Sequence, residues 1–390
     1  MTDEIALRYG LNPHQQPARA LFSGDAAPIV IRNGAPGYVN LLDALSSWQL
    51  VRELRAVLGL PAAASFKHVS PAGAAVGLPL SESLARAYQV EPEGLSPVAL
   101  AYVRARGGDL VSSYGDFAAV SDRVDASLAR VLKREVSDGI VAPGYDDDAL
   151  EILSAKKGGK YLIVEADPDF QPPELENREM FGVTLEQPTD TAPIGPKLLE
   201  NVVTARREIP DDAARDLLLA TVALRYTQSN SVCVAADGQV IGLGAGQQSR
   251  IHCSRIACGK ADRWMLQQHP RVLDLPWQGG MKRPDRFTAR EQFIAYAELS
   301  PVERMHLLAQ LEGDVEPLSE AERHEWIEGF SSVLSHDAFI PFRDNVDRAQ
   351  ASAVRYILQP GGSIADDGVI AAANEYGITM AFSGLRLFRH

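Results

Sequence analysis

The chain has 390 residues, of which 46% are apolar and 23% charged, and its formal net charge is −13. This length allows two or three packed cores, and this balance is typical of an ordinary soluble globular enzyme. A diffuse negative charge without a basic stripe argues against nucleic acid as a partner, and no apolar run is long enough to span a bilayer. Because the N-terminus has no signal-peptide pattern, we expect a cytoplasmic protein with no membrane partner.

Charge and cysteine content set two further conditions on the function. A net charge of −13 would repel an anionic small substrate, so binding of a phosphate ester requires arginines and backbone N–H groups to gather locally. The three cysteines, Cys233, Cys253 and Cys258, have no regular spacing, and neither C-x-x-C nor H-x-E occurs. The pattern therefore predicts neither a disulfide framework nor zinc.

The first half of the chain alternates between helices and short apolar strands. Its predicted elements are a helix at 41–58 capped by Asn40, and buried strands at 62–66, 136–141 and 161–164. The first of these strands leads Lys67 and His68 into a turn predicted at 70–73. Several prolines between Asp167 and Pro196 then indicate a crossing between domains.

The second half continues this alternation after the crossing. Its predicted elements are a helix at 212–226, a hairpin of strands at 231–235 and 239–243 around Asp237-Gly238, a glycine turn at 244–250 that opens a helix to 268, a charged helical insertion from 269, a strand at 354–358, a helix ending near Tyr376, and final strands. Helices around short apolar strands predict a layered α/β architecture.

Lys67 and His68 form the first candidate catalytic pair. A histidine at a strand end is more often a structural residue, but a turn after a strand also places both side chains where clefts form. Histidine suits proton transfer at neutral pH, and an adjacent ammonium can stabilise developing negative charge. Both interpretations stay open on these residues alone.

Other segments also have both a structural and a functional interpretation. The polar run 227–231 is either a capped turn or a support for Asn230 as a hydrogen-bond donor to an oxyanion. The glycine turn 244–250 can cradle an anion, although its spacing fits neither the P-loop nor the dinucleotide motif. Segment 337–345 combines aromatic and acidic residues and is either a packed helix start or a wall for a flat pterin ring. Arg8 alone does not outweigh an incidental charge at a terminus.

Taken together, eight segments resemble one family. They are 7–15 (LRYGLNPHQ), 67–73 (KHVSPAG), 113–117 (SYGDF), 136–140 (VSDGI), 227–232 (TQSNSV), 244–250 (GAGQQSR), 342–348 (FRDNVDR) and 385–388 (LRLF). In this order they are similar to the AICAR transformylase part of the bifunctional purine biosynthesis enzyme. Because the motifs extend from residue 7 to the C-terminus, the resemblance is far more specific than any single motif.

The resemblance implies a fold, an assembly and an activity. The fold is α/β, with two cytidine-deaminase-like domains, at 1–174 and at 175–268 together with 331–390, and a helical insertion at 269–330. The assembly is a homodimer with active sites at the subunit interface. The activity is transfer of a formyl group from 10-formyltetrahydrofolate to the 5-amino group of an aminoimidazole carboxamide nucleotide (AICAR), which gives formyl-AICAR and tetrahydrofolate.

The site residues that the resemblance implies fall into four groups. Catalysis is assigned to Lys67, His68 and Asn230. The AICAR site comprises Arg8, Tyr9, Gly115, Asp138, Arg250, Phe339 and Arg386, with the phosphate held by Arg8, Tyr9 and Arg386. The folate site comprises Val111, Tyr114, Ile251, Pro341, Phe342, Asp344 and Asn345. A potassium ion is expected near Thr227, Ser229, Ser231 and Asp337.

The chain departs from the family pattern in three places. Because the transformylase motifs begin at residue 7, we expect the cyclohydrolase domain of the bifunctional enzyme to be absent and a separate IMP cyclohydrolase to act as a partner. Tyr114 stands where many relatives have Phe, which keeps an aromatic wall. The C-terminus reads Arg389-His390 rather than two histidines.

Two other functions fit part of the sequence. A deaminase would share the implied fold, but zinc-ligand spacing is missing. A non-catalytic nucleotide- or folate-binding paralogue would be expected to lack Lys67, His68 or Asn230, and all three are present. The sequence leaves open whether formyl-folate or free formate is the physiological donor.

Overall fold

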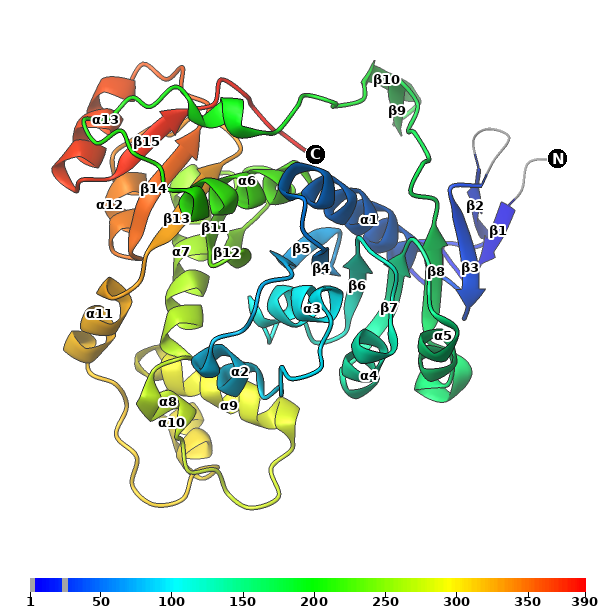
Figure 1. Cartoon of the computed structure of the whole chain (residues 1–390), viewed down its shortest axis with the longest axis horizontal. Coiled ribbons are helices and arrows are strands. Elements are labelled where there is room, and N and C mark those ends of the chain that lie inside the picture. Colours follow the sequence, from blue (N-terminus) through cyan, green and yellow to red (C-terminus); the bar gives the residue numbers. More distant parts are fainter. Residues whose placement is uncertain (1–3, 23–26) are drawn as a thin grey trace.

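The computed structural model describes residues 4–22 and 27–390 of the chain. Its centre is an 11-stranded mixed sheet with helices on both faces (Figure 1). Across the sheet the strands are, in order, β15 (Thr379–Phe382), β14 (Val354–Gln359), β13 (Ser332–His336), β11 (Val232–Ala236), β12 (Gln239–Gly244), β5 (Ser70–Val76), β4 (Ala62–Lys67), β6 (Asp116–Val120), β7 (Ser137–Ala142), β8 (Leu162–Ala166) and β3 (Ile29–Asn33). The predicted α/β class is confirmed, while cytidine-deaminase-like domains stay a prediction.

Each face of the sheet has its own hydrophobic core. The two long helices α1 (Tyr38–Leu58) and α6 (Asp211–Arg225) pack against each other and cover one face. The other face is covered mainly by α3 (Pro97–Gly107) and α7 (Arg250–Leu266). Because both cores include side chains from both halves of the chain, the packing joins the halves, and the predicted domain boundary at residue 174 stays a prediction.

Shorter helices surround these layers. They are α2 (Glu82–Tyr88), α4 (Ala126–Arg134), α5 (Asp147–Ser154), α8 (Pro270–Leu273), α9 (Arg283–Ile294), α10 (Pro301–Leu308), α11 (Glu320–Glu328), α12 (Asp344–Gln350) and α13 (Asp366–Glu375), with short 3-10 turns at Lys156–Gly159, Pro196–Leu199 and Tyr296–Glu298. The segment predicted as a helical insertion, 269–330, contains α8 to α11 (Figure 1). Within the described ranges no helix is both long and apolar enough to cross a bilayer.

Most predicted elements of the sheet are confirmed. The strands expected at 62–66, 136–141 and 161–164 correspond to β4, β7 and β8. The hairpin expected around Asp237-Gly238 is present, because β11 and β12 pair antiparallel across those two residues. The Asp-Gly dipeptide takes positive φ at both positions, which a tight two-residue turn requires.

The turn predicted at 70–73 is wrong. Ser70–Val76 is strand β5, which pairs antiparallel with β4 so that Lys67 lies opposite Ser70. The chain instead reverses at His68 and Val69, whose φ angles of 54° and 60° are typical of left-handed turn positions. The Ser-Pro pair misled the prediction because turn residues normally carry such signals, and His68 and Val69 do not.

Two further predictions need correction. Asn40 does not cap the first long helix, because α1 begins at Tyr38 after Gly37, and the Asn40 side chain instead accepts a hydrogen bond from the Gly37 backbone N–H at 3.2 Å. The proline-rich crossing also contains an unpredicted hairpin of β9 (Leu175–Met180) and β10 (Val183–Pro188), which is exposed along its whole length (Figure 1). A separate two-stranded sheet of β1 (Glu4–Leu7) and β2 (Ala18–Leu21) precedes the central sheet.

Candidate active site

Most of the predicted site residues lie along one edge of the central sheet. In one half, Lys67 ends β4, Gly115 precedes β6 and Asp138 is the second residue of β7. Neighbouring strands align these ends, since Phe66 pairs with Phe117 and Asp116 with Ser137. The strand ends therefore bring residues from three separate motifs to the same edge.

The other half of the sheet presents its own motifs at this edge. Val232 of β11 pairs with Gly244 of β12 and with His336 of β13, so Asn230, the glycine turn and Asp337 lie together. The halves meet between β12 and β5, where the register contains one pair, Gln239 with Ala75, at the opposite end of these strands. The predicted residues consequently form two clusters rather than one continuous site within a single chain.

The first cluster lines a cavity of about 750 Å³. Six predicted residues share its wall: Arg8, Tyr9, Lys67, His68, Gly115 and Asp138. The Arg8 guanidinium stacks over the Tyr9 ring at 4.8 Å, and Asp138 forms a 2.7 Å ion pair with Lys157. Gly115 has a φ of 78°, a conformation that a side chain would strain, so this backbone can approach a ligand closely.

A buried carboxylate supports the catalytic pair in this cavity. The Asp43 side chain on α1 accepts a hydrogen bond from the Val69 backbone N–H at 2.7 Å and lines the same cavity as His68. Burial raises the pKa of Asp43 to about 6, while the hydrogen bond from Val69 and the charge of His68 act in the opposite direction. Asp43 was not predicted, although an acid between Leu42 and the buried Ala44 is the one signal that could have indicated it.

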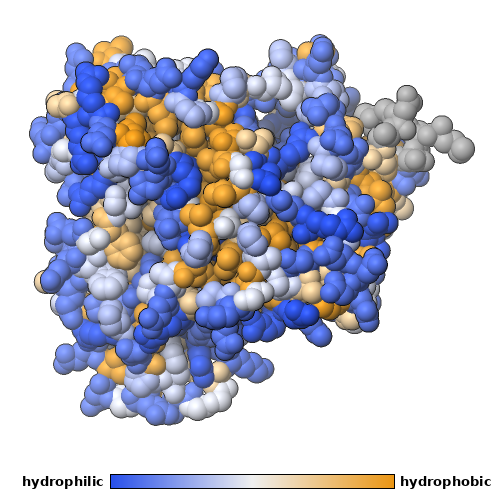
Figure 2. Space-filling view, in the orientation of Figure 1, coloured by the Kyte–Doolittle hydropathy of each residue, from blue (hydrophilic) through white to orange (hydrophobic). Residues whose placement is uncertain are grey.

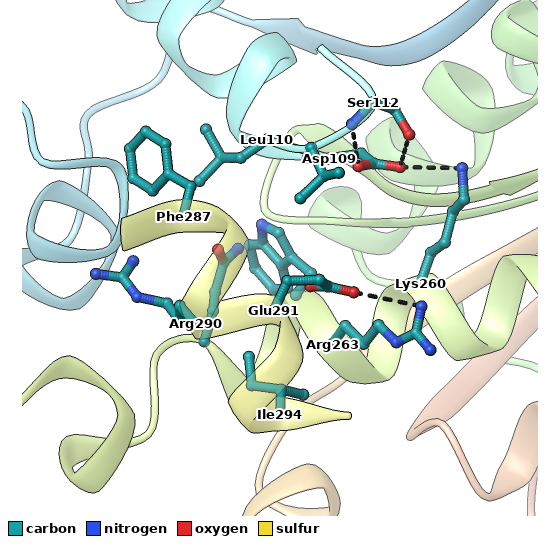
Figure 3. A pocket seen from close by; sticks show the side chains of 13 residues that line it. Asp109, Leu110, Ser112, Lys260, Arg263, Phe287, Arg290, Glu291 and Ile294 are labelled. Carbon is teal, nitrogen blue, oxygen red and sulfur yellow. Dashed lines mark hydrogen bonds and ion pairs between the residues drawn. The ribbon is translucent and has the colours of Figure 1, made fainter. Parts of the chain in front are cut away.

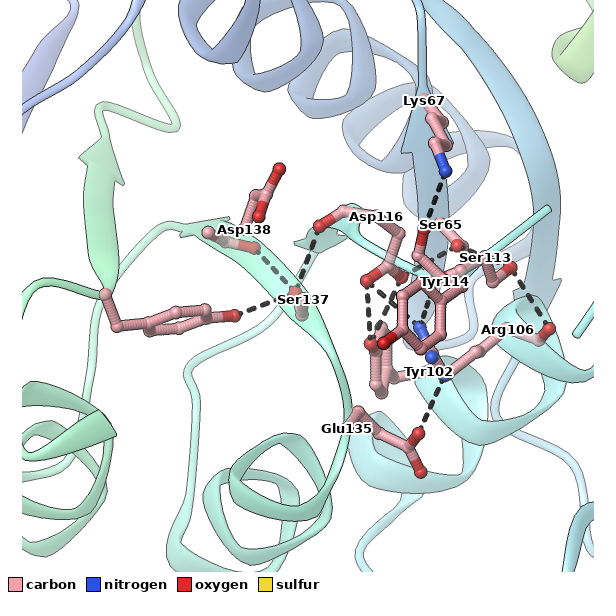
Figure 4. A network of polar contacts seen from close by, with 12 residues as sticks. Ser65, Lys67, Tyr102, Arg106, Ser113, Tyr114, Asp116, Glu135, Ser137 and Asp138 are labelled. Carbon is pink, nitrogen blue, oxygen red and sulfur yellow. Dashed lines mark hydrogen bonds and ion pairs between the residues drawn. The ribbon is translucent and has the colours of Figure 1, made fainter. Parts of the chain in front are cut away.

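Lys67 rests on a second buried network (Figure 4). Its Nζ donates to the Tyr114 carbonyl at 2.6 Å. Behind this contact, Asp116 is fully buried, lies 3.1 Å from the Arg106 guanidinium and accepts from the Ser65 hydroxyl at 2.7 Å. Burial raises the pKa of Asp116, and the positive charge of Arg106 opposes that rise. These contacts fix the Tyr114 loop to the end of β4, so the position of the lysine is determined by the core.

The second cluster contains Asn230 and Arg250. The Arg250 guanidinium lies 2.6 Å from buried Asp337 and donates to the Asn230 side-chain oxygen at 2.7 Å. The Asn230 amide nitrogen donates to the backbone carbonyl of Gln247 at 2.8 Å, in the glycine turn. Neither residue lines the cavity of the first cluster, and the same holds for Phe339 and Arg386, which are exposed.

The residues predicted to hold potassium do not all point to one place. The hydroxyls of Ser229 and Ser231 both donate to Asp337, at 2.6 and 3.0 Å, so three of the four residues converge. The Thr227 hydroxyl instead donates to the Ala223 carbonyl within α6. Oxygen atoms of this kind suit a hard cation. Potassium at this position stays a prediction.

The predicted folate residues divide between the two halves. Val111 and Tyr114 are exposed in the loop before β6, whereas Ile251 is the second residue of α7 and the remaining four lie at 341–345. Exposed Phe342 is available to a ligand. The buried Asn345 side chain accepts from the Ser254 hydroxyl at 2.7 Å, which indicates a packing contact between α7 and α12.

A small cavity of about 160 Å³ lies between the loop that contains Val111, α7 and α9 (Figure 3). Polar contacts around this cavity hold the loop in place. Asp109 forms a 2.9 Å ion pair with Lys260 and accepts from the Ser112 N–H and hydroxyl, at 2.9 and 2.7 Å. Burial raises the pKa of Glu291 on the facing wall. Val111 is the sole predicted site residue in this wall. We therefore regard the cavity as a packing contact, in which the Asp109–Lys260 ion pair joins the loop to α7.

Comparison with known proteins identifies the family. Residues 1–260 match the family model described as AICARFT/IMPCHase bienzyme. The bifunctional purine biosynthesis protein PurH of Cereibacter sphaeroides is 31% identical over 389 residues, and that of Xylella fastidiosa is 30% identical over 394 residues. Each alignment covers 98% of this chain, but the chain spans only 59% and 58% of the length of these relatives. The chain belongs to the AICARFT/IMPCHase bienzyme family.

Proposed function

We propose that this chain is a formyltransferase of purine biosynthesis. It transfers the formyl group of 10-formyltetrahydrofolate to the 5-amino group of AICAR and releases tetrahydrofolate. The observation that carries the proposal is the cavity of about 750 Å³ in which Lys67 and His68 meet Arg8 and Asp138. A base, a cation and a separate arginine in one cavity match the needs of a reaction between a phosphate-bearing amine and an acyl donor.

The acceptor amine is a weak nucleophile, because its lone pair is conjugated into the imidazole carboxamide. In the proposed mechanism, His68 removes a proton from this amine as its nitrogen attacks the formyl carbon. Lys67 stabilises the negative charge that develops on the formyl oxygen, and Lys67 or a water protonates N10 of the folate as the C–N bond breaks. Holding both substrates in register can itself lower the barrier by roughly 7–11 kcal/mol in the best-oriented cases.

The role of Asn230 is less direct than that of Lys67. Its amide nitrogen already donates to the carbonyls of Gln247 and Gln248, at 2.8 and 3.3 Å. An amide that donates to a formyl oxyanion would have to exchange one of these contacts on substrate binding. We therefore place Asn230 in the proposed mechanism as a second oxyanion donor, and regard Lys67 as the principal one.

The phosphate of AICAR is assigned to Arg8 and Tyr9 in the first cluster, together with Arg386 in the second. Arg8 is exposed, and no carboxylate lies within salt-bridge distance of it among residues 4–22 and 27–390. Its charge is thus available to an anion even though the whole chain carries −13. The ribose and the imidazole ring of AICAR are assigned to Gly115 and Asp138, which lie at the ends of neighbouring strands.

A homodimer would bring the two clusters together. Lys67 and His68 lie in one cluster and Arg250, Phe339 and Arg386 in the other, yet the proposed substrates must touch both. The clusters share one edge of the sheet but are separated where β5 and β12 diverge. We propose that the second cluster of one subunit faces the first cluster of its partner, with potassium near Asp337 as a structural ion.

The main alternative is a non-catalytic paralogue that binds a nucleotide or a folate. Nothing in the site favours it, since Lys67 and His68 are present and supported by Asp116 and Asp43. The direct test is an absorbance assay for tetrahydrofolate release, with purified protein, AICAR and 10-formyltetrahydrofolate. Release that depends on both substrates supports the proposal. Binding of AICAR without any release would establish the paralogue instead.

A further inference from the structure

The residues after β15 form an irregular segment that passes the second cluster and ends beside α6 (Figure 1). This segment, residues 383–389, is called here the C-terminal arm. It carries Arg386, which the proposed function assigns to the phosphate of AICAR. Arg386 is exposed, and an arginine on an irregular segment loses much conformational freedom when it holds an anion in one place. Contacts that fix the arm beforehand reduce this loss.

Backbone contacts hold the arm in front of Arg386. The Ser383 N–H donates to the Gln359 carbonyl at 2.8 Å, and the Gly384 N–H donates to the Pro360 carbonyl at 3.1 Å. Both acceptors lie at the end of β14 or directly after it, so the arm leaves the sheet in a fixed direction.

Further contacts hold the arm behind Arg386. The Leu387 N–H donates to the Asp337 carbonyl at 2.8 Å, and the buried Leu387 side chain belongs to the same hydrophobic core as α6. Apolar residues also reach the surface over α6 and the strands beside it (Figure 2). The Arg389 N–H donates to the Ser229 hydroxyl at 3.1 Å, and the Ser229 N–H donates to the Arg389 carbonyl at 2.9 Å. Arg386 therefore lies between two held parts of the backbone.

The side chain of Arg389 attaches the last residue of the arm to the end of α6. Its guanidinium donates to the Arg225 carbonyl at 3.3 Å and lies over the Tyr226 ring at 5.4 Å. Arg225 is the last residue of α6, where unpaired carbonyls favour a positive charge. Within residues 4–22 and 27–390 no carboxylate lies within salt-bridge distance of Arg389, so its main polar contact is with this helix end.

The end of α6 is itself a fixed support. The Arg225 guanidinium pairs with Glu53 of α1 and lies 3.3 Å from Asp190, and the Tyr226 hydroxyl donates to Glu53 at 2.7 Å. Burial raises the pKa of Glu53, and the charge of Arg225 opposes this rise. Through these contacts the position of Arg389 depends on the packing of α1 against α6.

We propose that Arg389 is a positioning residue for Arg386, an inference that rests on the proposed function. The Arg386 guanidinium lies over the Phe388 ring at 4.8 Å, and Phe388 directly precedes Arg389 in the arm. Loss of the contacts between Arg389 and α6 would therefore loosen the ring on which Arg386 rests. Because Arg389 acts through Arg386, its removal should weaken binding of the phosphate and leave binding of the rest of the nucleotide unchanged.

Calorimetry with the Arg389→Gln variant tests this role. We expect the Kd for AICAR to rise about three- to tenfold, as for loss of one hydrogen bond and one favourable charge at a helix end. The dephosphorylated nucleoside should bind the variant and the wild type equally well. In an Arg386→Ala background, Arg389→Gln should cause no further rise, because the group that Arg389 positions is already missing. Arg389→Met, which keeps the length of the side chain, is measured in the same way in case Arg389→Gln does not fold.

Arg207→Gln is the matched control, because Arg207 is exposed and also donates to a backbone carbonyl, that of Val202, at 2.8 Å. It should leave the Kd for AICAR unchanged, which separates a local contact from loss of overall charge. Equal weakening of nucleotide and nucleoside by Arg389→Gln, an unchanged Kd, or a further rise in the Arg386→Ala background would overturn the role of Arg389 while leaving the formyltransferase intact. If the wild type releases no tetrahydrofolate from AICAR and 10-formyltetrahydrofolate, the proposed function itself is wrong.

Discussion

The backbone N–H of Val69 donates to the buried carboxylate of Asp43 at 2.7 Å. Val69 and His68 both have positive φ, a conformation that is costly for a β-branched residue. The hydrogen bond offsets part of this cost and joins the turn to α1. This turn places Lys67 and His68 at the cavity. Asp43, a helix residue outside the reaction, therefore determines where the proposed catalytic pair lies.

Replacing Asp43 by Asn should change how stability depends on pH. Burial raises the pKa of Asp43 from 3.8 to about 6 in the folded chain, so the folded state binds this proton more tightly than the unfolded state does. Stability from this group is therefore greatest at low pH and is lost as pH rises from about 4 to 6, by up to about 1.4 kcal/mol per pH unit. Asn keeps an acceptor for Val69 but cannot ionise.

Urea denaturation at a series of pH values measures this difference. The free energy of unfolding of the wild type, relative to Asp43→Asn, should fall between pH 4 and pH 6 and stay constant above pH 7. A parallel pH dependence in both proteins would show that Asp43 does not titrate in this range. Asp43→Ala serves as a second variant, since it removes the acceptor as well and should lower stability at every pH.

His68→Ala tests the proposed general base. We expect turnover to fall by about 10²–10⁴, the usual contribution of a positioned proton-transfer group, while the affinity for AICAR stays nearly unchanged. His324→Ala is a suitable control, because His324 is an exposed histidine on α11, in the helical insertion. If the two variants retain similar turnover, the proton is removed by another group.

Arg8→Ala tests the assignment of the phosphate. Loss of a charge-assisted contact should weaken AICAR binding by roughly 1.5–3 kcal/mol, measured by calorimetry. The dephosphorylated nucleoside should bind the variant and the wild type equally well. Arg19→Ala is the comparison, since this exposed arginine pairs with Glu4 and lies outside the cavity. Equal weakening of nucleotide and nucleoside would make Arg8 a structural residue.

The residues of the first cluster were predicted through the family resemblance, and the structure places them in short motifs at the ends of apolar strands. Lys67, Gly115 and Asp138 each lie at or next to the end of an apolar strand, and neighbouring strands align these ends. Asp43 could not be predicted in this way, since its hydrogen bond joins residues 26 positions apart and depends on how α1 packs over β4. The chain reversal at Val69 was not predicted for a related reason, because a valine gives no turn signal.

The exposed hairpin and the divergence of β5 and β12 could not be predicted from sequence patterns either. The strands β9 and β10 are flanked by prolines, and such residues normally indicate a loop. The strands β5 and β12 share a single register pair, Gln239 with Ala75, and diverge beyond it. This divergence leaves no trace in the composition of the sequence. The list of predicted site residues therefore did not reveal that they lie in two separate clusters.

The two clusters make a specific prediction about assembly. If each active site combines the first cluster of one subunit with the second cluster of its partner, a chain with Lys67→Ala and a chain with Arg386→Ala should each be nearly inactive alone. In a mixed dimer, one site would contain both changes and the other neither. Mixing equal amounts through denaturation and refolding should then restore about a quarter of wild-type activity, since half of the dimers are mixed and half of their sites are intact.

The controls separate this outcome from other origins of activity. Lys67→Ala mixed with His68→Ala should restore nothing, because both changes lie in the first cluster and every site of a mixed dimer contains one of them. Asn230→Ala provides a second partner for Lys67→Ala, in case Arg386→Ala alone leaves turnover high. Sedimentation at the assay concentration gives the oligomeric state. If Lys67→Ala recovers no activity with either second-cluster variant although mixed dimers form, the clusters of a single chain must meet each other, and β5 and β12 must then close together when the substrates bind.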